Sequence, residues 1–168
     1  AFDIHRVALQ NAKGDLIDLA YAYRDYKLRI ALDTVYTRKQ EYQVYIQYTA
    51  NPKNVEAEGS AAITDARGLY FIDPQEKDPE KPTQIWTQGE TESSSCWFPT
   101  IDKPNEKMTH DIKITVPERF LTLSNGIKTK SLSNKNDTRT DTWSMDLPHA
   151  PYLVMMAIGE FSVVKDTW

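Results

Sequence analysis

Apolar and polar residues alternate along several short stretches of the chain, which is the period-two pattern of strands with one buried and one wet face. The apolar positions of the three clearest stretches are Tyr42, Val44, Ile46 and Tyr48; Tyr26, Leu28, Ile30 and Leu32; and Ile112, Ile114 and Val116. Each stretch therefore predicts a half-buried strand that is polar on its other face.

Further strands are predicted in the second half of the chain. Residues 119–126 run into the turn pair Asn125-Gly126, and residues 140–147 place Trp143, Met145 and Leu147 on one face. Residues 152–164 are too continuously apolar for either face to be exposed to solvent, which predicts a central strand. No long stretch has a helical period with caps, so the pattern predicts a mostly β protein of packed sheets.

Two polar segments interrupt these patterns. Residues 73–84 contain three prolines and six charges, which is typical of an exposed loop. Residues 128–142 are similarly polar and predict a hairpin with a long mobile tip.

Composition and charge narrow the classes of function. The 168 residues include 20 basic and 24 acidic side chains, for a net charge of −4, and no basic stripe that would neutralise phosphates, so we expect no nucleic-acid partner. The longest strongly apolar run, residues 152–158, is far shorter than the roughly 20 residues of a membrane-spanning helix, so no membrane span is predicted. No localisation follows from the sequence.

Side chains that could carry chemistry are few and scattered. His5, His110 and His149 stand alone, without the paired spacing of a zinc helix, and we expect them to be surface or packing residues and no metal to be bound. There is no glycine-rich phosphate loop and no GxSxG elbow. Cys96, the only cysteine, cannot form an internal disulfide and is expected to be buried and inert. No catalytic residue is predicted in this chain.

One segment with an unusual composition suggests a family. It contains Thr87, Gln88, Gly89, Glu90, Phe98, Pro99, Asp102, Pro104 and Lys107. The spacing resembles, without gaps, the signature of the N-terminal domain of M1-family zinc aminopeptidases. Residues 148–161 are similar to a strand near the end of that domain, and residues 68–72 to a stretch that precedes the signature.

The chain departs from the family pattern at three positions. The family usually has arginine at the position of Ser95, often alanine at Met108, and a bulkier residue at Gly89. These differences concern the packing of the loop and the substrate preference rather than membership of the family.

The resemblance implies a saddle-shaped β-sandwich of mostly antiparallel strands that docks against a separate catalytic domain. In the family that second domain provides the GxMEN strand and the HExxH zinc site, and neither motif occurs in this sequence. We therefore expect residues 1–168 to be a single N-terminal β domain, incomplete at its N-terminal edge and without its catalytic domain. Zinc would belong to the parent enzyme and not to this chain. The expected partners are the catalytic domain of the same polypeptide and peptides with a free N-terminus.

The resemblance also assigns roles to two residues of the signature. Glu90 would hold the substrate α-amine by a charge-assisted hydrogen bond, and Gln88 would line the pocket for the first side chain. Capture of the amine would fix the scissile bond one residue into the peptide.

The remaining signature residues have structural readings. Phe98, Pro99 and Pro104 would stiffen the loop, and Asp102 and Lys107 would be structural partners. The flanking tryptophans, Trp86 and Trp97, would anchor the loop by burying aromatic area.

Two other functions remain open at this stage. The chain could be a non-catalytic M1-like scaffold for protein interaction, although such a scaffold has no need of an amine-binding acid at position 90. It could also be an unrelated β-sandwich that binds carbohydrate through exposed aromatic residues such as Tyr21 and Tyr23.

Overall fold

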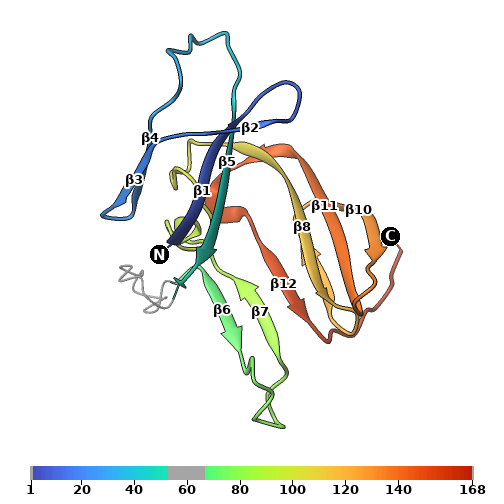
Figure 1. Cartoon of the computed structure of the whole chain (residues 1–168). Coiled ribbons are helices and arrows are strands. Elements are labelled where there is room, and N and C mark those ends of the chain that lie inside the picture. Colours follow the sequence, from blue (N-terminus) through green and yellow to red (C-terminus); the bar gives the residue numbers. More distant parts are fainter. Residues whose placement is uncertain (1, 53–66, 168) are drawn as a thin grey trace. The chain divides into compact units, whose positions relative to one another are not determined.

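The computed structural model describes residues 2–52 and 67–167, which are built from β-strands, short 3-10 helices and no α-helix (Figure 1). The strands are β1 (Phe2–Gln10), β2 (Leu16–Asp18), β3 (Tyr21–Arg24), β4 (Lys27–Ile30), β5 (Gln43–Ala50), β6 (Leu69–Ile72), β7 (Gln84–Thr87), β8 (Met108–Pro117), β9 (Leu121–Ser124), β10 (Ile127–Ser133), β11 (Thr138–His149) and β12 (Met156–Gly159). The 3-10 helices are η2 (Ser94–Cys96) and η3 (Pro151–Leu153). The described residues divide into two compact units: 2–52 with Cys96–Pro99, and 67–95 with 100–167.

The first unit contains an antiparallel sheet of order β2-β1-β5 and the hairpin β3-β4. Its buried core consists of Val7, Leu9 and Leu19, against which Ile4, Leu28, Ile30, Leu32, Val44 and Ile46 pack. The alternation predicted for β4 and β5 is confirmed, because their apolar residues share the core side while the intervening residues are exposed. Tyr26 and Tyr42 lie outside these strands and are exposed, since Tyr26 occupies the β3–β4 turn with φ of 57°.

The second unit is a β-sandwich of two antiparallel sheets, of order β10-β11-β8 and β6-β7-β12-β9. Ile114 and Val116 of β8, Trp143 of β11 and Ile158 of β12 form one buried cluster, so side chains of both sheets meet in a common core. The predicted all-β fold of antiparallel strands is confirmed.

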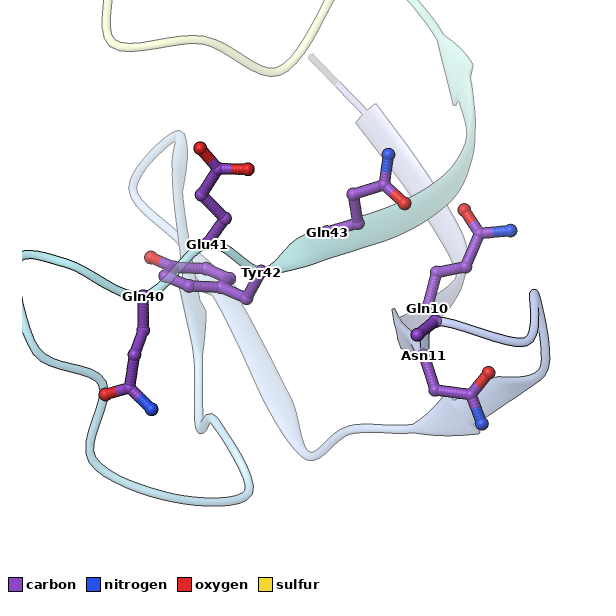
Figure 2. A pocket seen from close by; sticks show the side chains of 7 residues that line it. Gln10, Asn11, Gln40, Glu41, Tyr42 and Gln43 are labelled. Atoms are coloured by element: carbon purple, nitrogen blue, oxygen red, sulfur yellow. The ribbon is translucent and has the colours of Figure 1, made fainter.

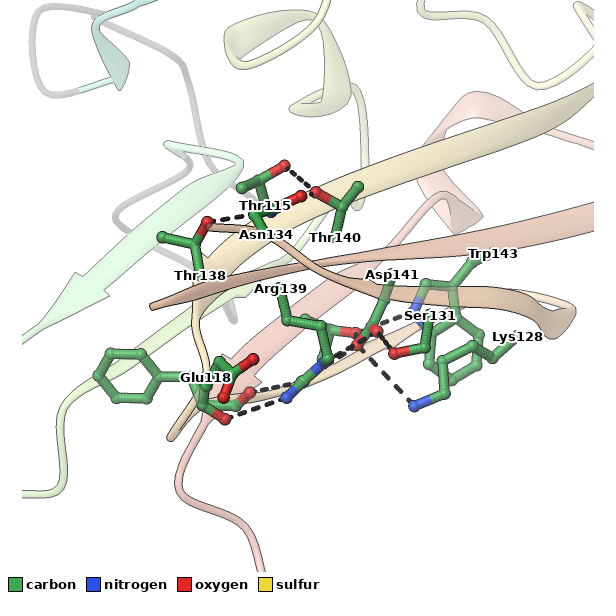
Figure 3. Close-up of polar contacts among 12 residues, drawn as sticks. Thr115, Glu118, Lys128, Ser131, Asn134, Thr138, Arg139, Thr140, Asp141 and Trp143 are labelled. Atoms are coloured by element: carbon green, nitrogen blue, oxygen red, sulfur yellow. Dashed lines mark hydrogen bonds and ion pairs between the residues drawn. The ribbon is translucent and has the colours of Figure 1, made fainter. Parts of the chain in front are cut away.

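A fully buried carboxylate is built into this sandwich (Figure 3). Asp141 has no exposed surface and accepts hydrogen bonds from Ser131 Oγ at 2.6 Å and Thr122 Oγ1 at 2.7 Å, while the Arg139 guanidinium reaches both of its oxygens. Thr122 in turn accepts a hydrogen bond from the indole nitrogen of Trp143 at 3.0 Å. Strand β9 therefore turns its polar residues inward and leaves Leu123 49% exposed.

The last apolar segment is only partly the strand that its sequence predicts. Strand β12 does lie between β7 and β9, which confirms the central position, but it covers four residues and follows η3. The side chain of Asn125 explains the late start, because its Nδ2 donates to Leu153 O at 3.0 Å and its Oδ1 accepts from Met155 N at 2.7 Å. The Asn125 side chain thus binds the backbone groups of Leu153 and Met155 that a longer strand would pair with a neighbouring strand.

The two polar segments differ in how well they match expectation. Residues 73–83 form the largely exposed loop that was predicted between β6 and β7. The expected long hairpin tip is wrong, since β10 and β11 extend to Ser133 and Thr138 and leave four residues between them. Backbone and side chain of Asn134 both bind Thr138, which closes the tip early.

None of the described helices is long and apolar enough to cross a membrane.

Candidate functional site

The segment that contains the two candidate site residues leaves the sandwich at the end of β7. This strand is paired on both sides, with β6 and with β12. Gln88 follows it directly, and its backbone N–H donates to Gly68 O at 3.0 Å. The position at which the loop begins is therefore fixed by the sheet.

Gln88 and Glu90 interact with each other within this loop. The Oε1 atom of Gln88 accepts a hydrogen bond from the backbone N–H of Glu90 at 2.9 Å. The Glu90 side chain is exposed, and within residues 2–52 and 67–167 its carboxylate forms no hydrogen bond or ion pair. The arrangement holds the backbone of Glu90 in place and leaves both carboxylate oxygens available to a ligand.

Gly89 lies where no side chain fits. A Cβ atom at this position would overlap the carbonyl oxygen of Tyr152 and would lie 2.6 Å from Ser94 Oγ and 2.8 Å from Tyr152 Cα. At Gly89 the loop therefore packs so closely against the backbone of η3 that no residue with a side chain would fit. This contact gives a physical reason for glycine at this position.

Three consecutive serines, Ser93 to Ser95, bind the two ends of the loop and η3 through one hydroxyl group and two backbone N–H groups. Ser94 is buried and donates from Oγ to Pro151 O at 2.8 Å, and Ser93 N donates to Gly89 O at 2.9 Å. Ser95 N donates to Asp102 Oδ2 at 2.8 Å, which is a structural contact of the kind expected for Asp102. The loop is thus bonded at both of its ends and to η3.

The other residues of the segment differ in their burial and in their contacts. Glu92 forms an ion pair of 2.7 Å with Lys103, whereas Lys107 is exposed. In the first unit Phe98 and Pro99 are half-buried, and Pro104 in the second unit is exposed. Any stiffening of the loop by Pro104 would therefore come from its fixed φ and not from burial.

The two tryptophans differ in their surroundings. Trp86 stacks on Tyr70 across the β6–β7 pair, with ring centroids 4.5 Å apart, yet it remains 38% exposed. Trp97 is half-buried in the first unit, packs edge-on against Phe98 at 4.6 Å, and accepts a hydrogen bond at its carbonyl from Tyr48 at 3.2 Å. Anchoring by burial thus describes Trp97 better than Trp86.

A hollow of about 570 Å³ in the first unit was not foreseen from the sequence (Figure 2). It is lined by Gln10, Asn11, Ala12, Gln40, Glu41, Tyr42 and Gln43. Asn11 and Gln40 are occupied in their own turns, because Asn11 Oδ1 accepts from the backbone of Lys13 and Asp15 and Gln40 Oε1 accepts from Thr37. Most of the lining residues are polar, and the hollow lies where β1 ends and β5 begins.

A catalytic zinc ion usually needs three protein ligands close together. Among residues 2–52 and 67–167 no group of three or more histidine, cysteine, aspartate or glutamate side chains is arranged to hold a metal ion. Cys96 is buried, as expected. The described residues therefore do not provide the ligand set of a catalytic zinc ion.

Comparison with known proteins connects this loop and fold to one family. A family model described as "Peptidase M1 N-terminal domain" matches residues 2–153. Human glutamyl aminopeptidase is 27% identical over 145 residues, which cover 76% of this chain and 14% of that protein. The rat glutamyl aminopeptidase is 33% identical over 70 residues, which cover 42% of this chain and 7% of that protein.

Two further similarities come from other proteins. The chicken transcription initiation factor TFIID subunit 2 is 27% identical over 105 residues, which cover 60% of this chain and 9% of that protein. The crystal structure of an M1 zinc metallopeptidase from Deinococcus radiodurans matches with a TM-score of 0.72 at 15% identity, over 94% of this chain and 32% of that one, and supports the fold. The chain spans about a seventh or less of the length of these three curated relatives.

Proposed function

Because the chain belongs to the family of M1 peptidase N-terminal domains, we propose that it recognises the substrate α-amine for a zinc aminopeptidase whose catalytic domain lies elsewhere in a longer polypeptide. Residues 1–168 would act as one N-terminal β domain. Support for this comes from the family match, which extends from residue 2 to residue 153 and so includes residues of both compact units.

The observation that carries the proposal is the exposed carboxylate of Glu90 on a loop whose backbone is fixed. An α-ammonium group that reaches this carboxylate would form charge-assisted hydrogen bonds, which are stronger and shorter than neutral ones. Because Gln88 Oε1 and the packing of Gly89 hold the loop, the backbone of Glu90 would need little reordering when an amine binds. Holding the amine at one place would then set which peptide bond reaches the reacting groups.

Gln88 would have two tasks in this proposal. Its Oε1 is bound to the backbone of Glu90, which positions the amine-binding residue. Its Nε2 remains as a donor that could line the pocket for the first side chain of the substrate. A zinc ion would be bound outside the described residues, so no step of its chemistry is assigned to this chain.

The test is kinetic and uses the protein translated from the native reading frame that contains these residues. Glu90→Gln keeps the shape of the side chain and removes its charge. Since a hydrogen bond to a charged group is worth about 1.5–3 kcal/mol, kcat/KM for substrates with a free amine should fall roughly 10–150-fold. Glu92→Gln is the matched control, because Glu92 lies on the same loop but is paired with Lys103. Unchanged kinetics in Glu90→Gln, with full zinc content, would remove Glu90 from the site.

A non-catalytic scaffold is the second candidate. It is favoured by the similarity to TFIID subunit 2, which is named as a subunit of a transcription initiation factor and not as a peptidase. The two candidates differ in what the longer protein must contain. An aminopeptidase binds zinc stoichiometrically and releases N-terminal residues, whereas a scaffold does neither. Metal content and peptide hydrolysis by the native protein therefore separate them.

A further inference from the structure

Two histidines that are far apart in sequence lie side by side on the β8–β11 pair. The register pairs His110 with Met145 and Met108 with His149, and residues 146–148 bulge between these two pairs. Since residues two apart on a strand share a face, His110 and His149 project from the same face of the sheet. Their ring centroids are 5.0 Å apart, with 64° between the ring planes.

The nitrogens of these rings lack the partners that buried polar atoms normally have. Within the described part of the chain, neither Nδ1 nor Nε2 of His110 has a hydrogen-bond partner, and the same holds for Nε2 of His149, although all three atoms are buried. Buried polar groups without partners cost free energy and often indicate a water molecule or an ion that completes them. The pair thus differs from His5, whose Nε2 is 2.8 Å from Thr49 Oγ1.

The remaining nitrogen of His149 fixes the tautomer of that ring. Its Nδ1 lies 3.0 Å from the carbonyl oxygen of Leu147 and, because a carbonyl only accepts, must carry the proton in this contact. The lone pair of the neutral ring is then on Nε2. A backbone carbonyl that orients one ring nitrogen while the other is left as a ligand is the arrangement found around metal-bound histidines.

We propose that His110 and His149 form a two-imidazole site for a divalent late transition-metal ion, of the class of Zn²⁺, Ni²⁺ or Cu²⁺, with the other coordination positions left to water or a small ligand. The distance between the rings fits one shared ion. With metal–nitrogen bonds of about 2.0–2.1 Å and ligand angles of about 90–110°, two imidazole centroids lie about 4.5–5.3 Å apart. Because χ2 of histidine is broad, the rings can turn toward one ion without movement of the strands.

The surroundings of the pair suit a cation. Metal binding requires neutral imidazole, and the pKa of His110 is lowered by burial and by the neighbouring His149, against an opposing effect of Asp111. A hollow of about 230 Å³, lined by Thr109, His110, Asp111, Met145 and Asp146, lies next to this pair but does not include His149. Its two carboxylates raise the local concentration of cations.

This site would be separate from the zinc ion of peptide hydrolysis. Two protein ligands are fewer than the three that catalytic zinc ions usually have. The inference rests chiefly on the geometry of His110 and His149 and does not depend on the role of Glu90.

The test titrates the 168-residue chain, freed of metal by chelation, with Zn²⁺. Calorimetry should give one equivalent of bound ion, and the imidazole ¹⁵N resonances of His110 and His149 should shift while those of His5 do not. His110→Gln and His149→Gln should each raise the dissociation constant at least about tenfold, because loss of a second-shell partner already costs 10–100-fold. His5→Gln is the matched control and should bind like the unchanged chain.

Three outcomes would overturn the proposal. One is the absence of saturable binding, in which case a water molecule or packing alone accounts for the pair. Another is binding that shifts the resonances of His5 instead. The last is binding that both glutamine variants retain. The ¹⁵N resonances of the unchanged chain decide the question even if one variant fails to fold.

Discussion

The Arg139 guanidinium forms two hydrogen bonds with the carboxylate of Asp141, which lies two residues later on β11. Nε donates to Oδ1 at 3.0 Å, and a terminal nitrogen donates to Oδ2 at 3.2 Å. The same guanidinium donates to the carbonyl oxygens of Glu118 and Phe120 at 3.0 and 2.7 Å. An ion pair between the fully buried Asp141 and the 17% exposed side chain of Arg139 thus connects β11 to the β8–β9 turn. This ion pair lies in the same β-sandwich as β7, the strand that precedes the loop of Gln88 and Glu90.

Asp141→Asn should destabilise the second unit strongly. The substitution leaves the Arg139 charge without its partner in a buried setting, and breaking a buried pair in this way costs about 3–5 kcal/mol. Chemical denaturation followed by tryptophan fluorescence measures the change in the free energy of unfolding. Asp146→Asn on the same strand is the control and should change this free energy by less than about 0.5 kcal/mol. Equal effects of the two variants would contradict the importance of the buried pair.

The stability of the unit should fall in acid because of the same residue. Burial raises the pKa of Asp141, but hydrogen bonds from Arg139, Ser131 and Thr122 outweigh it and lower the pKa from 3.8 to about 2. A carboxyl group whose pKa is depressed in the folded state contributes stability above its unfolded pKa, and that stability is lost as the pH falls toward 2. The contribution is about 2 kcal/mol at neutral pH and disappears between about pH 5 and pH 1. Unfolding free energies measured across this range should show the loss, and Asp141→Asn should flatten it.

Thr122→Val tests the inward polar face of β9. Valine has nearly the shape of threonine but cannot bind Asp141 Oδ2 or accept from the Trp143 indole, so two buried groups lose a partner. The expected cost is about 1–3 kcal/mol. Leu123→Thr on the outward face should change the free energy of unfolding by less than about 0.5 kcal/mol. A larger loss of stability for Leu123→Thr than for Thr122→Val would show that Thr122 does not face the core.

Gly89→Ala tests the close packing of the loop on η3. The added methyl group meets the backbone of Tyr152, which must shift, and overpacking of this kind costs about 1–3 kcal/mol. Thermal unfolding measures the loss of stability, and amide chemical shifts of residues 88–95 and 151–153 should move together. Glu92→Ala, which removes only an exposed ion pair, should cost no more than about 1 kcal/mol. Unperturbed shifts at 151–153 would argue against the contact.

How much of the fold the sequence predicts depends on how its strands alternate. Strand β8 is predicted well because Ile112, Ile114 and Val116 follow one period on one face. Strand β1 is not predicted, because Val7, Ala8 and Leu9 are buried in succession and the register shifts between Ile4 and Arg6. Three buried residues in succession have no period of two, and the run is too short to predict a central strand in the way that residues 152–164 do.

Other features depend on side chains that act at a distance. The inward face of β9 is polar because Asp141 lies opposite, and β12 is short because Asn125 binds the backbone before it. Neither contact can be inferred from local sequence. The candidate site has the same property, because an exposed glutamate resembles any other surface acid, and Glu90 was singled out by family resemblance and not by its own chemistry.

The most direct test of the central claim combines a change in the enzyme with a change in the substrate. In the longer protein, kcat/KM is measured for Glu90 and Glu90→Gln with a peptide substrate and with its analogue in which the α-amino group is replaced by hydrogen. If Glu90 binds the amine, the substitution should lower kcat/KM roughly 10–150-fold for the peptide and hardly at all for the analogue, because the lost interaction is worth about 1.5–3 kcal/mol. Equal losses with both substrates would contradict amine recognition by Glu90.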